Sequence, residues 1–443
     1  MRQRDIFFFW VPLFASWLLM TAEGPIISAA INRLPDEVIM LAAMGIVTSL
    51  SITIESPIIN LLATSTALVK DRPSYNLVRR FTIQWCLALT VIAILVAFTP
   101  LFDLIVTGWL DVPQEVAQWV QPGMMIMVFW SAAIGWRRFL QGVLIRFNHT
   151  RKIAWGTALR LLASGGVAIG LALWGQWPGV IIGAIALMAG VVAEALYTTI
   201  VVQPVKKREL PLSVQAEGFQ PLTYRRLTSF HLPLAATSLL ILLMQPMVTS
   251  SLARLANPTE SLAAWPVVFQ IMLMARAAAL ALPEVIIARY QERGDFVPLR
   301  RFSFHLAALV TLAIALFVVL PMSDFYIFSI QNMTLEVGLL ALSALPYFVL
   351  FPAMAVFTSW LRGLLIHNHH TKFVNAGMVI NLTITAVILV TGVSLRWQGL
   401  PTAALALNLA ALGEMIYLAW RTQSTLPIEL KLFGKPKTQF SQI

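Results

Sequence analysis

The sequence predicts an all-α polytopic membrane protein with twelve transmembrane helices in two six-helix bundles, and three observations predict this fold. The 443 residues are 58% hydrophobic and 12% charged, whereas soluble domains carry roughly 25% charged residues. The apolar residues recur in runs long enough to cross a hydrocarbon core of about 30 Å as helices. The second half of the chain also repeats the first half at a fixed spacing. These observations exclude a soluble protein.

Twelve apolar runs are expected to form the transmembrane helices. The first run follows a basic start and shows no Ala-x-Ala-like cleavage site, so we expect it to stay as a helix rather than be removed as a signal peptide. The predicted spans are 6–32, 38–69, 81–107, 117–145, 153–174, 178–203, 228–255, 260–288, 302–323, 335–366, 373–393 and 399–421.

The longest polar link divides these spans into two groups of six. We expect an N-terminal six-helix bundle over residues 1–203, a cytoplasmic linker over 204–227, a C-terminal six-helix bundle over 228–421 and a basic cytoplasmic tail over 422–443. Lys and Arg concentrate in this linker, in the tail and in the loops that follow the second, fourth and eighth spans. The positive-inside rule therefore places both termini in the cytoplasm of a plasma (inner) membrane protein.

The internal repeat holds one register over most of the chain. With an offset of 221 residues and no gap, the matching segments include Phe9–Leu13 with Phe230–Leu234, Pro25 with Pro246, and Gly142–Arg151 with Gly363–Lys372. After the loss of one residue, Glu194 matches Glu414. Because each half has an even number of spans, the two halves share one orientation, and the axis that relates them lies along the membrane normal.

Ionisable residues within the spans are functional candidates, because a charge in hydrocarbon costs several kcal/mol unless it is paired or hydrated. Glu55 and Arg276 occupy equivalent positions in the repeat. We predict that this pair faces a polar chamber between the two halves and either binds substrate or forms a gate. A purely structural bridge across the cleft is the alternative.

Glu23 is the candidate for ion coupling. It precedes Gly24-Pro25, which loosens the helix and exposes backbone groups. A desolvated carboxyl group can exchange protons between the two sides of a membrane. The alternatives are a sodium site formed with backbone oxygens and a structural cap of the kink. We therefore expect no cofactor, with H⁺ or Na⁺ as the coupling ion.

Arginines near the predicted cytoplasmic mouth are candidates for attracting an anionic substrate. Arg138 and Arg160 belong to this set, together with Arg137, and snorkelling towards lipid headgroups is the alternative. Adjacent residues on a helix point about 100° apart, so one of Arg137 and Arg138 is expected to face the cleft. Arg362, Glu194 and Glu414 are either further site residues or members of structural ion pairs.

Several functional classes lack their sequence signatures. The chain has no Walker A sequence, no Ser/His/Asp arrangement and no HExxH motif, so it is not expected to be an enzyme or a nucleotide-driven pump. A single Cys86 excludes an intramolecular disulfide and a cysteine metal cluster. The His369-His370 pair belongs to a repeated loop motif, so no metal site is expected, and no pattern indicates nucleic-acid binding.

The sequence resembles the multidrug and toxic compound extrusion superfamily and, within it, the progressive ankylosis protein family. The segments that carry the resemblance are Ala22-Glu-Gly24, Ile31-Asn-Arg-Leu34, Leu41-Ala-Ala-Met-Gly45, Val69-Lys-Asp-Arg72, Gly142-Val-Leu-Ile-Arg146 and Phe230-His-Leu-Pro-Leu234. The resemblance implies two lobes that rock around a central cavity. It also implies export of small polyanions such as citrate, pyrophosphate and nucleotides.

These observations lead to one favoured function and two alternatives. We expect a secondary-active exporter of small organic or phosphorylated anions that acts as a monomer in the lipid bilayer. A proton- or sodium-coupled exporter of cationic drugs is the first alternative, because Glu23 and Glu55 also suit a cation. A flippase for a lipid-linked precursor is the second.

Overall fold

The structure is a computed structural model that describes residues 2–212, 221–290, 295–368 and 370–425. These residues form helices and connecting turns, without strands in the described ranges. The all-α fold class predicted from the sequence is therefore confirmed. The tail beyond residue 425, residues 213–220 of the predicted linker, and His369 lie outside the described residues.

The first half of the chain contains ten helices in the described residues, several of them consecutive parts of one span. They are α1 (Gln3–Thr21), α2 (Glu23–Ile31), α3 (Glu37–Glu55), α4 (Leu61–Leu68), α5 (Arg72–Phe98), α6 (Leu101–Asp103), α7 (Gln114–Ile126), α8 (Trp130–Arg146), α9 (Thr150–Trp174) and α10 (Gly179–Arg208).

The second half repeats this order. Its helices are α11 (Tyr224–Leu242), α12 (Met244–Ala253), α13 (Pro258–Leu280), α14 (Leu282–Arg289), α15 (Phe296–Val319), α16 (Met322–Asp324), α17 (Leu335–Ala344), α18 (Phe351–His367), α19 (Thr371–Ser394) and α20 (Gly399–Thr425).

Backbone irregularities recur at the predicted spacing of 221 residues. Left-handed backbone conformations occur at Asp36 and Asn257, and again at Asp111 and Asn332. A π-helical turn spans 104–109 in the first half and 325–330 in the second. Conformations that L-residues rarely adopt are costly, and their recurrence shows that the repeat extends to the backbone.

Proline explains where the long spans break. Pro25 follows the junction of α1 and α2, and Pro246 follows the equivalent junction of α11 and α12. Pro57 lies in the 3₁₀ turn after α3, and Pro283 lies at the start of α14. Proline has no backbone N–H and clashes with the preceding turn, so each helix is interrupted while the chain continues in the same general direction.

The number of spans differs in one respect from the sequence prediction. Within the described residues, ten helices are long and apolar enough to cross a membrane, and the segments Leu335–Phe348 and Phe351–His367, bent by 48° relative to each other, add an eleventh when they are counted as one span. The expected span 117–145 is not among them. It corresponds to α7 and α8, which a short 3₁₀ turn separates, and α8 carries Arg137, Arg138 and Arg146. The assignment of α7–α8 as a transmembrane span therefore depends on the repeat, in which these helices are equivalent to α17–α18.

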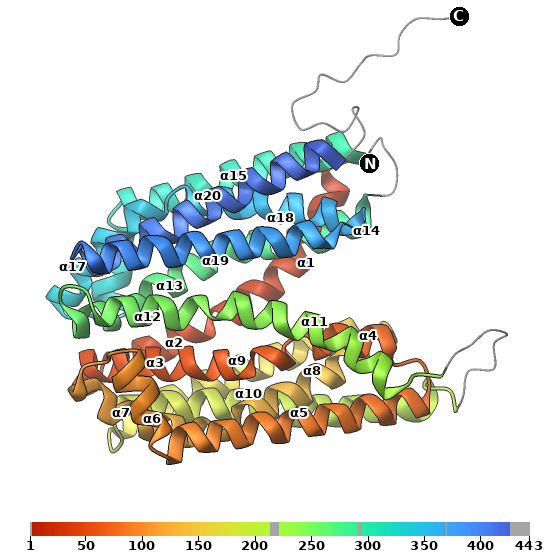
Figure 1. Cartoon of the computed structure of the whole chain (residues 1–443), viewed down its shortest axis with the longest axis horizontal. Helices are drawn as coiled ribbons and strands as arrows, with labels where there is room; N and C mark the ends of the chain where they lie inside the picture. The colour runs from red at the N-terminus through yellow and green to blue at the C-terminus, as the bar shows by residue number, and fades with distance from the viewer. Residues whose placement is uncertain (1, 213–220, 291–294, 369, 426–443) are drawn as a thin grey trace, which may run out of the picture.

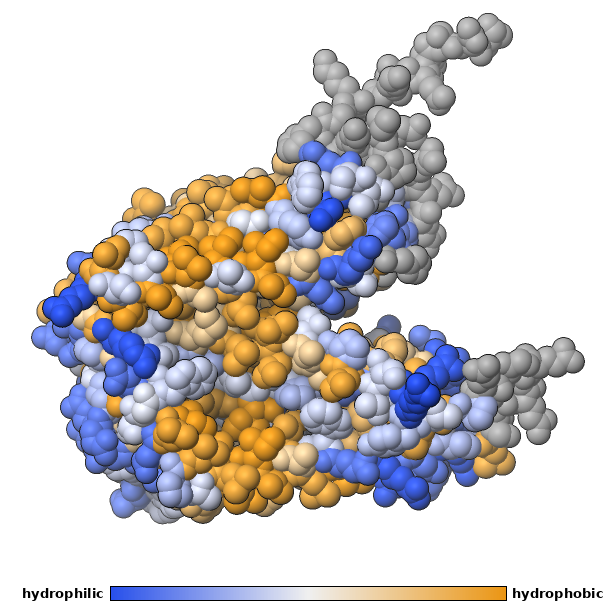
Figure 2. Space-filling model, viewed as in Figure 1, coloured by the Kyte–Doolittle hydropathy of each residue, from blue (hydrophilic) through white to orange (hydrophobic). Residues whose placement is uncertain are grey.

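The helices form two bundles that meet at one end and separate at the other (Figure 1). The described ends of α1 and α20 lie at the end where the bundles separate, and Figure 2 shows an open cleft there. Figure 2 also shows hydrophobic residues around the middle of the molecule and hydrophilic residues towards both ends, which is the pattern of a membrane-spanning protein.

Polar contacts join the two bundles at the closed end. Ser28 donates a hydrogen bond to the side-chain oxygen of Gln331 at 2.8 Å, and the amide of Gln331 donates to the carbonyl of Pro25 at 3.2 Å. Asn332 donates to the carbonyl of Asn32 at 2.9 Å. Close packing of α3 on α13 adds to these contacts, since a Cβ at Gly45 would lie 2.7 Å from Pro266.

The outer parts of α1 and α11 pack across the bundle boundary. Trp10 of α1 donates a hydrogen bond to the carbonyl of Ala278 at 3.0 Å, within the hydrophobic core of the second bundle. His231, the repeat equivalent of Trp10, lies 2.9 Å from the hydroxyl of Thr64 in α4. Each bundle therefore receives one helix segment from the other half of the chain.

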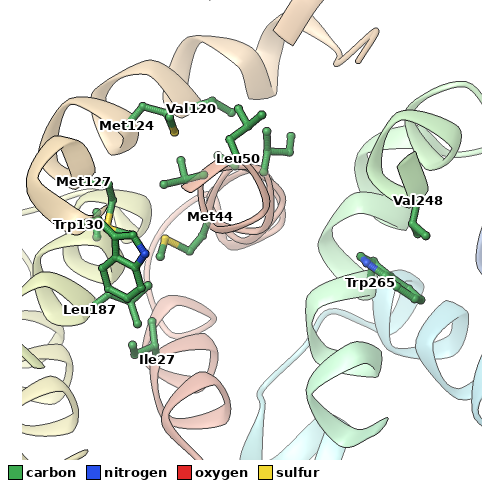
Figure 3. Packing of buried hydrophobic residues seen from close by; sticks show 14 of the residues in the cluster. Ile27, Met44, Leu50, Val120, Met124, Met127, Trp130, Leu187, Val248 and Trp265 are labelled. Atoms are coloured by element: carbon green, nitrogen blue, oxygen red, sulfur yellow. The ribbon is translucent and has the colours of Figure 1, made fainter. Parts of the chain in front are cut away.

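Apolar packing fixes the helices that carry polar residues. In Figure 3, Met44 and Leu50 of α3 face the segment that runs through Met124 and Met127 to Trp130. Trp130 is 5% exposed and belongs to the same core. Because large buried side chains hold neighbouring helices at fixed rotations, they also fix the direction of the charged groups beside them.

Candidate functional site: two repeat-related polar clusters

The first polar cluster lies in the first bundle and is centred on Glu194 of α10. The guanidinium of Arg137 donates to Glu194 at 2.5 Å, and the amide of Gln141 donates to the other carboxylate oxygen at 2.9 Å. The side chains of Arg137 and Glu194 are 4% and 0% exposed. Both oxygens of this buried carboxylate are therefore satisfied by α8.

Arg160 of α9 links this ion pair to α2. Its Nε atom lies 3.1 and 3.0 Å from the two carboxylate oxygens of Glu23, and one terminal nitrogen lies 2.5 Å from Glu23. The other terminal nitrogen lies 4.0 Å from Glu194. The guanidinium also lies over the ring of Trp130, 5.8 Å from its centroid. Glu23, at the break between α1 and α2, is thereby held by a bidentate ion pair.

Glu55 and Arg138 complete the first cluster without forming close ion pairs. Glu55 is buried at the end of α3, close to Trp130 and within electrostatic range of Arg138, Arg137 and Arg160. Its Oε2 atom has no hydrogen-bond partner among the described residues, and neither has the Nε atom of Arg138. The cluster thus contains three acidic and three basic side chains, which balance in formal charge.

The second polar cluster lies in the second bundle and is centred on Glu414 of α20. The Nε atom of Arg362 donates to Glu414 at 2.8 Å, and the amide of Asn381 donates to the other carboxylate oxygen at 3.0 Å. Glu414 is 3% exposed at its side chain, whereas Arg362 is 27% exposed. This ion pair is accordingly more open than the Arg137–Glu194 pair.

Arg276 of α13 is the unpaired cation of the second cluster. The described residues provide no hydrogen bond or ion pair to its guanidinium, and its Nε atom is buried without a partner. The guanidinium lies over the ring of Phe351, 5.4 Å from the centroid. An aromatic face attracts a cation by about 0.5–2 kcal/mol, but it does not satisfy guanidinium N–H groups. Arg276 therefore retains hydrogen-bonding capacity.

Arg276 lines a cavity of about 140 Å³ in the second bundle. Arg362, Asn381 and Glu414 also line it, with the hydroxyl groups of Thr358 and Ser359 nearby on α18. The remaining lining is mainly apolar and comes from residues of α11, α12, α13, α18, α19 and α20. The cavity thus combines a cationic region with a hydrophobic region, as ligand pockets commonly do.

The two clusters occupy the same positions of the repeat. At an offset of 221 residues, or 220 for the last pair, the equivalent residues are Glu23 and Met244, Glu55 and Arg276, Trp130 and Phe351, Arg137 and Thr358, Arg138 and Ser359, Gln141 and Arg362, Arg160 and Asn381, and Glu194 and Glu414. All eight second-half residues of this set line the cavity.

The structure distributes the predicted site residues between the two clusters. Glu23, Glu55, Arg138, Arg160 and Glu194 lie in the first cluster. Arg276, Arg362 and Glu414 lie in the second.

Glu55 and Arg276 do not form an ion pair within the described residues, so a direct bridge between the bundles is absent in this conformation. The predicted chamber was expected between the two halves, but the cavity around Arg276 is lined by second-half residues alone. Of the two adjacent arginines, Arg137 pairs with Glu194 through one terminal nitrogen, whereas Arg138 forms no close ion pair among the described residues and lies within electrostatic range of Glu55.

Several cluster residues were not identified from the sequence. Gln141, Asn381, Thr358 and Ser359 are uncharged, and a search for ionisable groups within apolar runs overlooks them. The internal repeat could have identified them, because each of these four residues aligns with an arginine in the other half of the chain.

Comparison with known proteins identifies the fold. No protein-family model and no curated protein matches the sequence. A solved structure described as the inward-facing conformation of a multidrug resistance MATE family transporter of the MOP superfamily matches with a TM-score of 0.69 at 14% identity, covering 92% of this chain and 95% of that chain.

Two further solved structures broaden the range of functions associated with this fold. A MOP superfamily transporter from Pyrococcus furiosus Vc1, for which reverse polarity of the binding pocket is said to suggest a different function, matches with a TM-score of 0.65 at 14% identity over 95% of each chain. The lipid II flippase MurJ in an inward closed conformation matches with a TM-score of 0.70 at 13% identity, over 96% of this chain and 89% of that chain. The fold is that of MATE/MOP transporters.

Proposed function

We propose that this protein is a secondary-active transporter that exports a small organic or phosphorylated anion by alternating access between its two bundles. The observation that carries the proposal is Arg276, a guanidinium without an acidic partner in the lining of a cavity. Arg276 is partly buried and its Nε atom is fully buried, so a guanidinium without a counter-charge is costly there, and an anionic ligand offsets that cost. The sequence resemblance to the progressive ankylosis protein family supports the same class of substrate.

The arrangement of the bundles supports alternating access. The bundles are joined by hydrogen bonds at one end and separated at the other, so one side of the proposed pathway is closed (Figures 1 and 2). The positive-inside distribution assigns the open end to the cytoplasm. We propose a monomer in the plasma (inner) membrane with both termini cytoplasmic and with an inward-open conformation in this structure.

The first cluster is proposed to couple transport to H⁺ or Na⁺. Glu55 has a buried carboxylate oxygen without a hydrogen-bond partner, and Glu23 lies at a helix break where movement of α1 would act on it. A cation that binds here changes the charge balance with the three arginines, and a transported ion can thereby bias one conformation over the other.

Two alternatives retain specific support. The unpartnered carboxylate oxygen of Glu55 favours an exporter of cationic compounds in which the first cluster binds the substrate directly. The fold likeness to a lipid II flippase favours transport of a lipid-linked precursor. A cationic substrate does not explain the unpaired Arg276, and the flippase is supported by fold likeness alone, so we place both below the anion transporter.

Transport assays in proteoliposomes test the proposed function. We expect uptake of at least one of labelled citrate, pyrophosphate or an aryl sulfonate above protein-free vesicles, stimulated by a pH or sodium gradient. Arg276→Gln is expected to reduce this uptake, and the exposed Arg80→Gln provides the matched control. Uptake of ethidium without uptake of any anion would reject the proposal in favour of the cationic exporter.

A further inference from the structure

We infer that the second-bundle cavity accepts the single charged group of an amphipathic organic monoanion and discriminates against polyanions. This inference rests on the proposed function and narrows its substrate class. It is carried by two features of the same cavity, which are the number of unpaired charges and the composition of the remaining wall.

The charge balance of the cavity leaves one positive charge available. Arg276 and Arg362 contribute two positive charges, and Glu414 contributes one negative charge. Arg362 is engaged by Glu414, which Asn381 also binds. One negative charge beside Arg276 therefore neutralises the cavity. A second negative charge on the ligand would lose its hydration in the cavity without gaining a second positive partner, so binding of a dianion is unfavourable.

The first cluster does not supply additional positive charge. Its three arginines are balanced by Glu23, Glu55 and Glu194, and none of its residues lines the cavity. The same repeat positions that hold Glu23 and Arg138 in the first bundle hold Met244 and Ser359 in the second. Among the residues that line the cavity, Arg276 is therefore the cation without an acidic partner.

Two hydroxyl-bearing residues line the same cavity as Arg276. The hydroxyl oxygen of Thr358 is buried and has no hydrogen-bond partner among the described residues, although it belongs to a residue of the cavity wall. A buried hydroxyl without a partner costs about 1–3 kcal/mol. A sulfonate or carboxylate that contacts Arg276 offers acceptor oxygens to Thr358 and to the neighbouring Ser359. We therefore place the charged head group at the Arg276 side of the cavity, with Thr358 and Ser359 as the candidate hydroxyl donors.

The rest of the wall is apolar and adaptable. Met244, Met272 and Met378 line the cavity together with Phe269 and Leu407. Methionine side chains are flexible and polarisable, so they adapt to apolar groups of different shape. The cavity volume of about 140 Å³ is roughly ten times the space that one water molecule needs. A fully hydrated polyanion leaves this apolar wall unused, whereas a compact aryl or branched alkyl group fills it.

A matched set of permanently charged probes separates these possibilities. Uptake of benzenesulfonate, 1,3-benzenedisulfonate and methanesulfonate into proteoliposomes compares one charge with two, and an aryl group with a methyl group. We expect benzenesulfonate to be favoured over each of the other two by about tenfold, which is the discrimination worth about 1.4 kcal/mol. Citrate and pyrophosphate complete the set as polyanions.

Two variants copy first-bundle residues into the cavity. Ser359→Lys adds a positive charge at the position of Arg138 and leaves the Arg362–Glu414 pair in place, so we expect preference to move towards the disulfonate. Met244→Glu copies Glu23 and cancels the available positive charge, so uptake of benzenesulfonate should fall to background. Arg80→Gln should behave as wild type. Monodisperse elution of each variant from a sizing column confirms that it folds.

The outcomes distinguish this inference from the function on which it rests. If no anion is taken up by well-folded protein, the proposed function fails, and this inference fails with it. If citrate, pyrophosphate or the disulfonate is preferred, or if Ser359→Lys leaves the preference unchanged, the monoanion inference is overturned while the anion transporter stands.

Discussion

The two polar clusters share one scaffold but differ in how their charges are satisfied. In the first bundle, three acidic and three basic residues balance in formal charge, and four of them, Arg137, Arg160, Glu23 and Glu194, form close ion pairs. In the second bundle, Glu414 keeps the equivalent position and is bound by Arg362 and Asn381, but Arg276 has no acidic partner in the cavity wall. The repeat therefore provides equivalent positions, and a few substitutions convert a neutral cluster into a candidate binding site.

The largest expected difference concerns the two central carboxylates. Glu194→Ala leaves Arg137 buried without a counter-charge, which typically destabilises a protein by about 3–5 kcal/mol. Glu414→Ala should cost less, because the side chain of Arg362 is 27% exposed and can be hydrated. Thermal unfolding of both variants in detergent measures this difference. Equal losses of stability would show that Arg137 and Arg362 are shielded from water to the same extent.

A second comparison sets Glu23 against its equivalent, Met244. If the first cluster couples transport to protons, Glu23→Gln should reduce anion uptake in a pH gradient to the level seen without a gradient, whereas Met244→Leu should retain the response. The loss of the charged partner of Arg160 should also lower stability by about 1.5–3 kcal/mol. Proteoliposome uptake with an imposed gradient measures coupling. A full response in Glu23→Gln would remove this residue from the coupling mechanism.

A smaller effect is expected at the closed end of the bundles. Gln331→Leu removes the hydrogen bonds to Ser28 and to the carbonyl of Pro25, and each such bond contributes about 1 kcal/mol. The equilibrium should move towards separation of the bundles at this end.

Thiol labelling can detect that movement. Cys86 is the single native cysteine, so Cys86→Ser followed by Ala29→Cys places one reporter at the closed end, beside Ser28, and leaves the Ser28 hydroxyl in place. We expect a membrane-impermeant reagent to label this reporter several-fold faster when Gln331 is replaced by leucine than when the exposed Arg80 is replaced by glutamine. Equal rates in these two backgrounds would contradict a gating role for Gln331.

The sequence allowed the fold class and the repeat register to be predicted, and all nine charged members of the two clusters were already candidates. Apolar runs of about 20 residues and the positions of Pro25 and Pro246 determine the spans and their breaks locally. The ion-pair partner of each charged residue could not be predicted in the same way. Pairing Arg160 with Glu23, or Arg362 with Glu414, depends on helix rotation and on contacts between residues far apart in sequence.

The crossing of helix segments between bundles was also hidden from the sequence. Trp10 and His231 lie at equivalent positions, but local patterns do not reveal that each packs on the opposite half of the chain. Similarly, the repeat placed Glu55 and Arg276 at equivalent positions without showing that they face different surroundings. Equivalent depth in a membrane does not establish contact across a cleft.

Ligand binding to purified protein tests the central claim most directly. Isothermal titration with benzenesulfonate should give weaker binding in Arg276→Gln than in wild type by about tenfold or more, since a hydrogen bond to a charged group contributes about 1.5–3 kcal/mol. The control is Arg138→Gln, which removes an arginine of the first cluster. Its affinity for benzenesulfonate should lie within about twofold of the wild-type affinity, a difference below about 0.5 kcal/mol. Unchanged binding in Arg276→Gln, or an equal loss in Arg138→Gln, would contradict the assignment of the anion site to the second bundle.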